Sequence, residues 1–146
     1  MKSPKGEIIT DAQLHSARVL TDLLRSKYSI PAANCTTHSQ VSVNPENFGV
    51  GAHTDWSAGF PYEQLGLPDN YSVPLPSVAH FGFDFDGAFL AVSDSPLRNG
   101  LLAAMASIRR EAEARKISQH NLRGILHEKY KSAMEALAQT RKGENL

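Results

Sequence analysis

Two histidines and one aspartate lie close together in a part of the chain that is rich in proline and glycine. His38, His53 and Asp55 have Pro and Gly residues on both sides. Such flanks place side chains on loops or at strand ends, where a rigid scaffold often holds functional groups. Imidazole nitrogens and carboxylate oxygens bind zinc, and a catalytic zinc takes three protein ligands and a water. The cluster predicts a metal site; the alternative is a hydrogen-bonded core histidine at position 38 and a polar turn at positions 53–55.

The H-x-D spacing of the second histidine and the aspartate has a geometric consequence. If the segment is extended, His53 and Asp55 project to the same face of the chain while Thr54 points away. Both side chains then reach one site, and Trp56 points to the opposite side, toward packing. The spacing therefore predicts that His53 and Asp55 act together.

A helix over residues 11–28 must position this segment from its N-terminal side. Thr10 and Gln13 have the spacing of a capping box, in which each side chain bonds the backbone of the other residue. Apolar residues then recur at helical spacing on one face, namely Leu14, Ala17, Leu20 and Leu24. We expect the helix to end near Tyr28, ahead of Pro31.

The middle of the chain, residues 31–92, is expected to form loops and short strands. It holds six of the 8 prolines and six of the 10 glycines. One strand is expected to lead into His38. Aromatic residues at positions 81, 83 and 85 alternate with small or acidic ones up to Asp86-Gly87, which predicts a β-hairpin with a tight turn and explains Asp84 and Asp86 without a metal.

Two helices are expected in the last third of the chain. Ser95 followed by Pro96 predicts an N-cap. One stripe runs through Leu97, Leu101, Met105, Ile108 and Ala112, and a second, after Ser118, runs through Leu122, Leu126, Tyr130, Ala133 and Leu137. The predicted fold class is α/β, a small mixed sheet flanked by helices, in a first domain over residues 1–92, with a helical extension over residues 93–146.

Composition excludes some classes of protein. The chain has 146 residues, with 15 Lys and Arg against 15 Asp and Glu, and nucleic-acid binding needs a clear basic excess. No apolar run is long enough for a membrane span, and the first residues lack the apolar core of a signal peptide. The single cysteine, Cys35, cannot form an internal disulfide.

The segment around the histidines resembles a known enzyme family. After the first predicted helix come KYSIP, THSQVSVNP and HTDW, in that order. This run, within residues 10–72, is similar to the C-terminal half of the zinc-dependent N-acetylmuramoyl-L-alanine amidases, a family that includes the peptidoglycan recognition proteins. The resemblance implies a partial amidase domain, a Zn²⁺ cofactor and peptidoglycan or a muropeptide as the substrate.

The resemblance also implies a role for each residue. His38 matches a histidine ligand at the end of a strand, and Asp55 matches the last zinc ligand. His53 takes the place of a lysine or threonine that stabilises the transition state, which implies a dependence on pH near neutrality. Trp56 and Tyr62 are candidates for binding the sugar or peptide; the alternative is that they belong to the local core.

Two departures from the family pattern shape the expected activity. The family's first histidine ligand lies on a strand before the helix, and in this chain no histidine precedes Thr10. The interval from His38 to Asp55 is also longer than usual. We therefore expect this chain to be part of a longer amidase, to bind zinc weakly and to turn over little by itself. The alternatives are a non-catalytic peptidoglycan-binding protein and an interaction domain built on the C-terminal helices.

The sequence leaves the place of action unknown, and the resemblance implies two alternatives. A full-length amidase is expected in the cell envelope or outside the cell. An enzyme that recycles muropeptides is expected in the cytoplasm.

Overall fold

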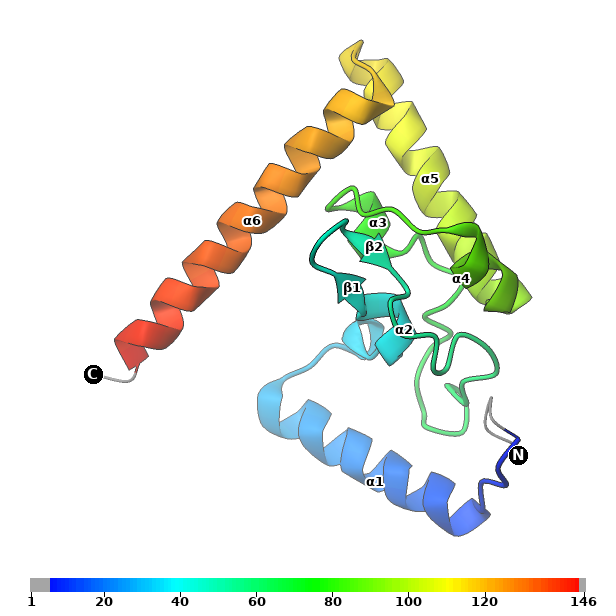
Figure 1. Ribbon diagram of the computed structural model, residues 1–146. Helices are drawn as coiled ribbons and strands as arrows, with labels where there is room; N and C mark the ends of the chain where they lie inside the picture. The colour runs from blue at the N-terminus through cyan, green and yellow to red at the C-terminus, as the bar shows by residue number, and fades with distance from the viewer. Residues whose placement is uncertain (1–5, 145–146) are drawn as a thin grey trace.

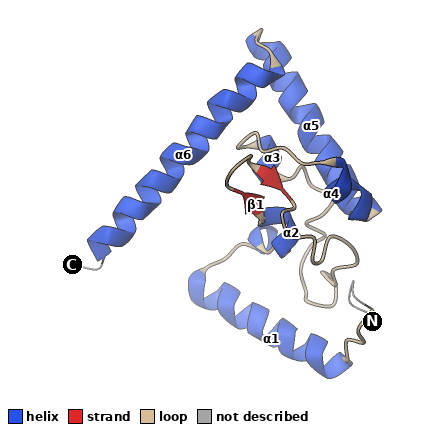
Figure 2. Cartoon of the chain, viewed as in Figure 1, coloured by secondary structure: helices blue, strands red, loops and turns tan. Residues whose placement is uncertain are grey.

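The structure is a computed structural model, which describes residues 6–144. The described chain is mostly helical, with one two-stranded antiparallel sheet, so the fold is a helix-rich mixture of α and β structure (Figures 1 and 2). The elements are α1 (Asp11–Tyr28), η1 (Ala32–Asn34), α2 (His38–Val41), β1 (Val43–Asn44), β2 (Gly49–Val50), α3 (Pro76–Ala79), α4 (Gly87–Val92), α5 (Ser95–Arg115) and α6 (Gln119–Glu144).

Helix α1 has the predicted bounds and the predicted capping box. The Gln13 backbone N–H donates to Thr10 Oγ1 at 3.2 Å, and the Thr10 N–H donates to Gln13 Oε1 at 2.9 Å. Ser29 ends the helix in a left-handed conformation and donates its N–H to the Arg25 carbonyl. No residue of α1 is buried, and Leu20 is 55% exposed. The helix lies along one side of the molecule, away from α5 (Figure 1).

The predicted strand leading into His38 is wrong. A short 3-10 helix, η1, occupies part of that segment, and His38 is the first residue of α2. The reason is local: Thr37 and Gln40 form a second capping box, which starts a helix at this point. The sheet follows α2 and pairs Val43 with Val50.

The predicted phenylalanine hairpin is also wrong. Asp86 caps helix α4, because its Oδ1 accepts the Phe89 backbone N–H at 2.9 Å. The preceding segment makes only a single bridge, between Asp84 and Gly49 of β2. Asp-Gly followed by apolar residues suits a capped helix as well as a turn, and burial of Phe89 on the core selects the helix.

Helix α5 begins one residue earlier than the predicted cap at Ser95 implies. The cap is Asp94, whose Oδ1 accepts the Leu97 N–H at 3.1 Å, and Ser95 is the first helical residue. The buried stripe consists of Leu97, Gly100, Leu101, Ala104, Ile108 and Ala112. Met105, which was expected in it, is 40% exposed, because Ala104 occupies the core side of that turn.

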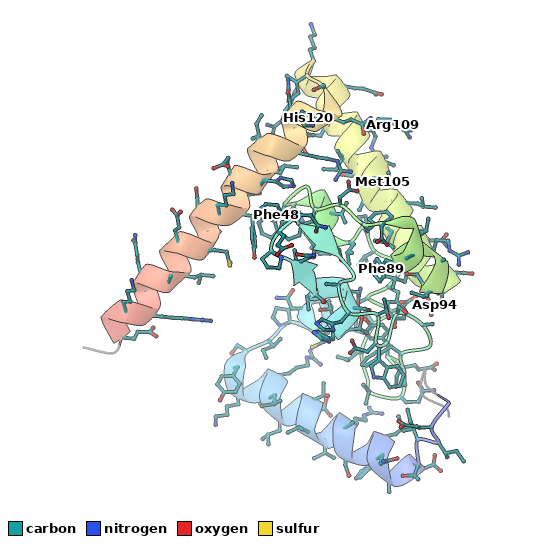
Figure 3. The ribbon with its side chains drawn as sticks, viewed as in Figure 1. Phe48, Phe89, Asp94, Met105, Arg109 and His120 are labelled. Atoms are coloured by element: carbon teal, nitrogen blue, oxygen red, sulfur yellow. The ribbon has the colours of Figure 1, made fainter. Side chains whose placement is uncertain are left out.

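Helices α5 and α6 meet at one end and then diverge (Figure 1). A small cluster fills the angle between them and contains Ile108, Ala112, Leu122 and Leu126. Of the predicted α6 stripe, Leu137 is 51% exposed, so only the first half of that helix is packed as expected. Phe48, in the turn between β1 and β2, stacks on His127 of α6 with ring centroids 4.7 Å apart. Figure 3 labels Phe48 on the side of the core that faces α6.

The main core is continuous across the middle of the chain and α5. It joins Val50 and Phe83 to Leu97 and Leu101 in one buried cluster. Gly100 allows this packing, because a Cβ there would lie 2.1 Å from the Tyr71 carbonyl oxygen. The division at residues 92 and 93 stays a prediction, and the buried cluster runs across it.

Among the described residues, no helix is long and apolar enough to cross a membrane.

Candidate functional site

His38 and Asp55 lie in direct contact. The Nδ1 atom of His38 is 3.0 Å from Oδ1 and 3.1 Å from Oδ2 of Asp55. The side chains are 55% and 46% exposed, so the pair is open to solvent. His38 is therefore not the core histidine of the alternative interpretation.

His53 is the third member of the cluster and contacts His38. Its ring stacks on that of His38, with centroids 4.9 Å apart and planes inclined by 21°. The Ser42 hydroxyl oxygen accepts the His53 backbone N–H at 2.9 Å. The segment 52–58 is a series of bends and turns, not the extended strand that the H-x-D spacing assumed. Both residues still reach His38, so the turn brings together the three side chains named from the sequence.

The carboxylate of Asp55 is stabilised in its charged form. Desolvation acts to raise its pKa, but hydrogen bonds from His38 and from the backbone, together with electrostatic interactions with His38 and His53, outweigh that effect. The net pKa lies below the ordinary value of 3.8. Asp55 is thus ionised at neutral pH and available as a hydrogen-bond acceptor or a metal ligand.

A buried glutamine holds the helix that carries His38. Gln40 is fully buried, and its Oε1 accepts the Thr37 N–H at 2.9 Å and the Tyr62 hydroxyl at 2.9 Å. Its Nε2 donates to the Asn70 carbonyl at 2.9 Å. The Asn70 side chain in turn donates to the carbonyls of Ala32 and Cys35 at 2.9 and 2.7 Å. This network holds α2 and the segment before it, from Ala32 to Thr37, in place.

The two aromatic residues expected to bind substrate differ in position. Trp56 is half-buried, packs edge-on against Phe60, and lines a groove of about 450 Å³ beneath α1. Tyr62 is buried, and burial raises the pKa of its phenol above the ordinary value. The position of Tyr62 agrees with the local-core interpretation, whereas Trp56 borders the groove against α1, which Asp55 does not line.

The sequence interpretation missed the residues that support the cluster. Gln40 had a usable signal, since Thr37 and Gln40 repeat the Thr-x-x-Gln pattern of Thr10 and Gln13. Ser42 and Asn70 had no local signal, because their partners lie far away in the sequence.

The pair has the spacing of two zinc ligands. Two atoms bound to one tetrahedral zinc, each ~2.1 Å from the ion, lie ~3.4 Å apart. The observed 3.0 Å between His38 Nδ1 and Asp55 Oδ1 is close to that value, and it also suits a hydrogen bond. Within residues 6–144, no three or more His, Cys, Asp or Glu side chains are grouped to hold a metal. The two atoms are of the kinds that bind zinc, and the described residues bring together two such donors where a catalytic site takes three.

Comparison of the chain with protein-family models, with curated proteins and with solved structures found no match.

Proposed function

We propose that the His38–Asp55 pair is the protein part of a zinc site in an N-acetylmuramoyl-L-alanine amidase, in which His53 acts on the substrate. The observation that carries the proposal is the 3.0 Å contact between an imidazole nitrogen and a carboxylate that lie on separate elements. Both atoms are of the kinds that bind zinc, at a spacing that one zinc ion accommodates. A further ligand has to come from outside this cluster.

The three residues of the cluster would have different roles. His38 Nδ1 and the Asp55 carboxylate would hold the metal. A zinc ion held there would supply an activated water and would polarise the amide carbonyl between N-acetylmuramic acid and L-alanine. The His53 ring lies against His38 and donates its N–H to the carbonyl oxygen as negative charge develops there. One such donor contributes ~3 kcal/mol to transition-state stabilisation in other hydrolases.

A second function is favoured by the number of possible zinc ligands that residues 6–144 bring together, which is fewer than three. A zinc ion on two protein ligands lacks the three anchors of a catalytic site. A peptidoglycan-binding protein that does not cleave its ligand needs no complete site. Trp56 beside Asp55 would then contact the sugar or peptide.

Zinc titration and an amidase assay on the whole chain test these functions. We expect His38→Ala and Asp55→Ala each to weaken zinc binding by at least tenfold. His53→Ala should keep the zinc and lower kcat by ~10²–10³ where turnover is measurable. His120→Ala is the control, because this exposed histidine lies at the start of α6, away from α2 (Figure 3).

Four outcomes separate the candidates. Release of the stem peptide from a muropeptide, dependent on His38 and Asp55, supports the amidase. Sedimentation of the chain with insoluble peptidoglycan, without release of peptide, supports the binding protein. Zinc affinity that neither His38→Ala nor Asp55→Ala changes contradicts the metal site, and loss of zinc on His53→Ala with retention on Asp55→Ala reverses the two roles.

A further inference from the structure

One backbone carbonyl joins the two elements of the candidate site. The carbonyl oxygen of Trp56 accepts a hydrogen bond from Ser39 Oγ at 3.2 Å and another from the Tyr71 hydroxyl. We propose that Ser39 and Tyr71 are positioning residues, which fix the loop carrying Asp55 against the helix carrying His38. For its consequence on zinc binding, the inference rests on the proposed function; its geometric part does not.

The positions of Ser39 and Trp56 in the chain explain why the hydrogen bond between them restrains the candidate site. Ser39 directly follows His38, and Trp56 directly follows Asp55. The bond between Ser39 and Trp56 therefore runs beside the contact between His38 and Asp55 and joins the same two elements. Two adjacent links restrict both translation and rotation of the loop, whereas a single contact restricts much less.

The residues that donate to the Trp56 carbonyl are buried, whereas those of the exposed pair are not. Ser39 is 0% exposed and Tyr71 is 3% exposed, whereas the side chains of His38 and Asp55 are about half exposed. An exposed ion pair contributes little and is screened by salt. A buried hydrogen bond persists, because a broken one leaves a polar group without a partner away from water. The link with buried donors therefore restrains the loop more firmly than the exposed pair does.

The conformation of Trp56 indicates that the loop is held in place. Its φ is +56°, in the left-handed region that a bulky side chain rarely adopts. Such a conformation persists only where the surrounding structure fixes it. The two hydroxyl donors on the Trp56 carbonyl and the packing of its ring against Phe60 provide that restraint.

The experiment compares Ser39→Ala and Tyr71→Phe with a matched control. Ser93→Ala also removes a buried hydroxyl that donates to a backbone carbonyl, but that bond, to Phe89 at 2.8 Å, holds the end of α4 and does not involve the Trp56 carbonyl. The metal-free readout is the nuclear Overhauser contact between the His38 ring and the Asp55 β-protons. The second readout is the affinity for Zn²⁺ alone, and thermal unfolding shows that each variant is folded.

We expect both test variants to reduce the Overhauser contact at least twofold and to weaken zinc binding by about tenfold, the usual effect of losing a group that orients a ligand. Ser93→Ala should change neither. A folded Tyr71→Phe or Ser39→Ala protein with the wild-type contact overturns the inference, as does an equal loss in Ser93→Ala. If wild type binds no zinc but the contact weakens only in the test variants, the positioning role stands and the proposed function fails.

Discussion

Helices α1 and α2 begin with the same sequence signal but differ in length and in burial. Each starts with Thr-x-x-Gln in a capping box, Thr10 to Gln13 in α1 and Thr37 to Gln40 in α2. Helix α1 has 18 residues and none is buried, whereas α2 has 4 residues, of which Ser39 and Gln40 are fully buried. A capping box starts a helix, but the partners of its glutamine decide what the helix does.

Those partners explain why the candidate site lies on the shorter helix. Gln13 bonds Thr10 within its own capping box, whereas Gln40 also binds Tyr62 and Asn70, which lie far away in the sequence. A helix of one turn is unstable by itself, so tertiary bonds must hold it. The same bonds place His38 at a defined position relative to Asp55.

The largest expected difference in stability between a buried and an exposed helix comes from replacing a leucine. Leu101→Ala in α5 removes a side chain that is 0% exposed and should lower the free energy of unfolding by ~3–4 kcal/mol. Leu23→Ala in α1, where the residue is 61% exposed, should change it by less than ~0.5 kcal/mol. Urea denaturation measures both. A loss at Leu23 as large as that at Leu101 would show that α1 is covered in solution.

The two glutamines provide the next test. Gln40→Ala leaves the Tyr62 hydroxyl and the Asn70 carbonyl without their partner and should lower the free energy of unfolding by ~3 kcal/mol. Gln13→Ala loses only exposed bonds and should lower it by less than ~1 kcal/mol. Equal effects in thermal or urea unfolding would show that the buried bonds of Gln40 do not hold α2 in place.

Replacing the capping threonine should also lower the free energy of unfolding more in α2 than in α1, but the difference should be smaller than for the glutamines. Thr37 is 2% exposed, and its hydroxyl bonds the Ser39 hydroxyl at 3.0 Å as well as Gln40. Thr37→Ala should therefore lower the free energy of unfolding by ~1–2 kcal/mol, and Thr10→Ala by ~0.5–1 kcal/mol. Helix content from circular dichroism, followed through urea unfolding, distinguishes the two variants. A greater effect at Thr10 would indicate that α1 contributes more to the fold than its exposure implies.

The smallest expected effect is the dependence on pH of the stability that Asp55 contributes. Its folded pKa lies below the unfolded value of 3.8, so its stabilising contribution is present above pH 3.8 and is lost as the pH falls through the folded pKa. The stability difference between wild type and Asp55→Asn should accordingly shrink below about pH 3.8 in metal-free protein. A difference that grows on acidification would show that the pKa is raised instead.

The predictions from sequence succeeded where the signal was local and failed where two local signals competed. Helix α1 was predicted with its bounds and cap, because propensity, periodicity and capping all agree over residues 11–28. At Asp86-Gly87 the turn signal and the helix-cap signal coincide, and the predicted hairpin was wrong. At Met105 the periodicity was right but the buried position was Ala104.

The sequence by itself determined the long helices and named His38, His53 and Asp55 as members of one cluster, since helical periodicity, capping and residue chemistry are all written in neighbouring positions. Only the tertiary structure decided that α1 exposes its leucines, that Gln40 is buried and that the Trp56 carbonyl links the two elements of the site. Those features depend on which distant groups meet, because a buried hydrogen bond is stable only when both of its partners leave water together.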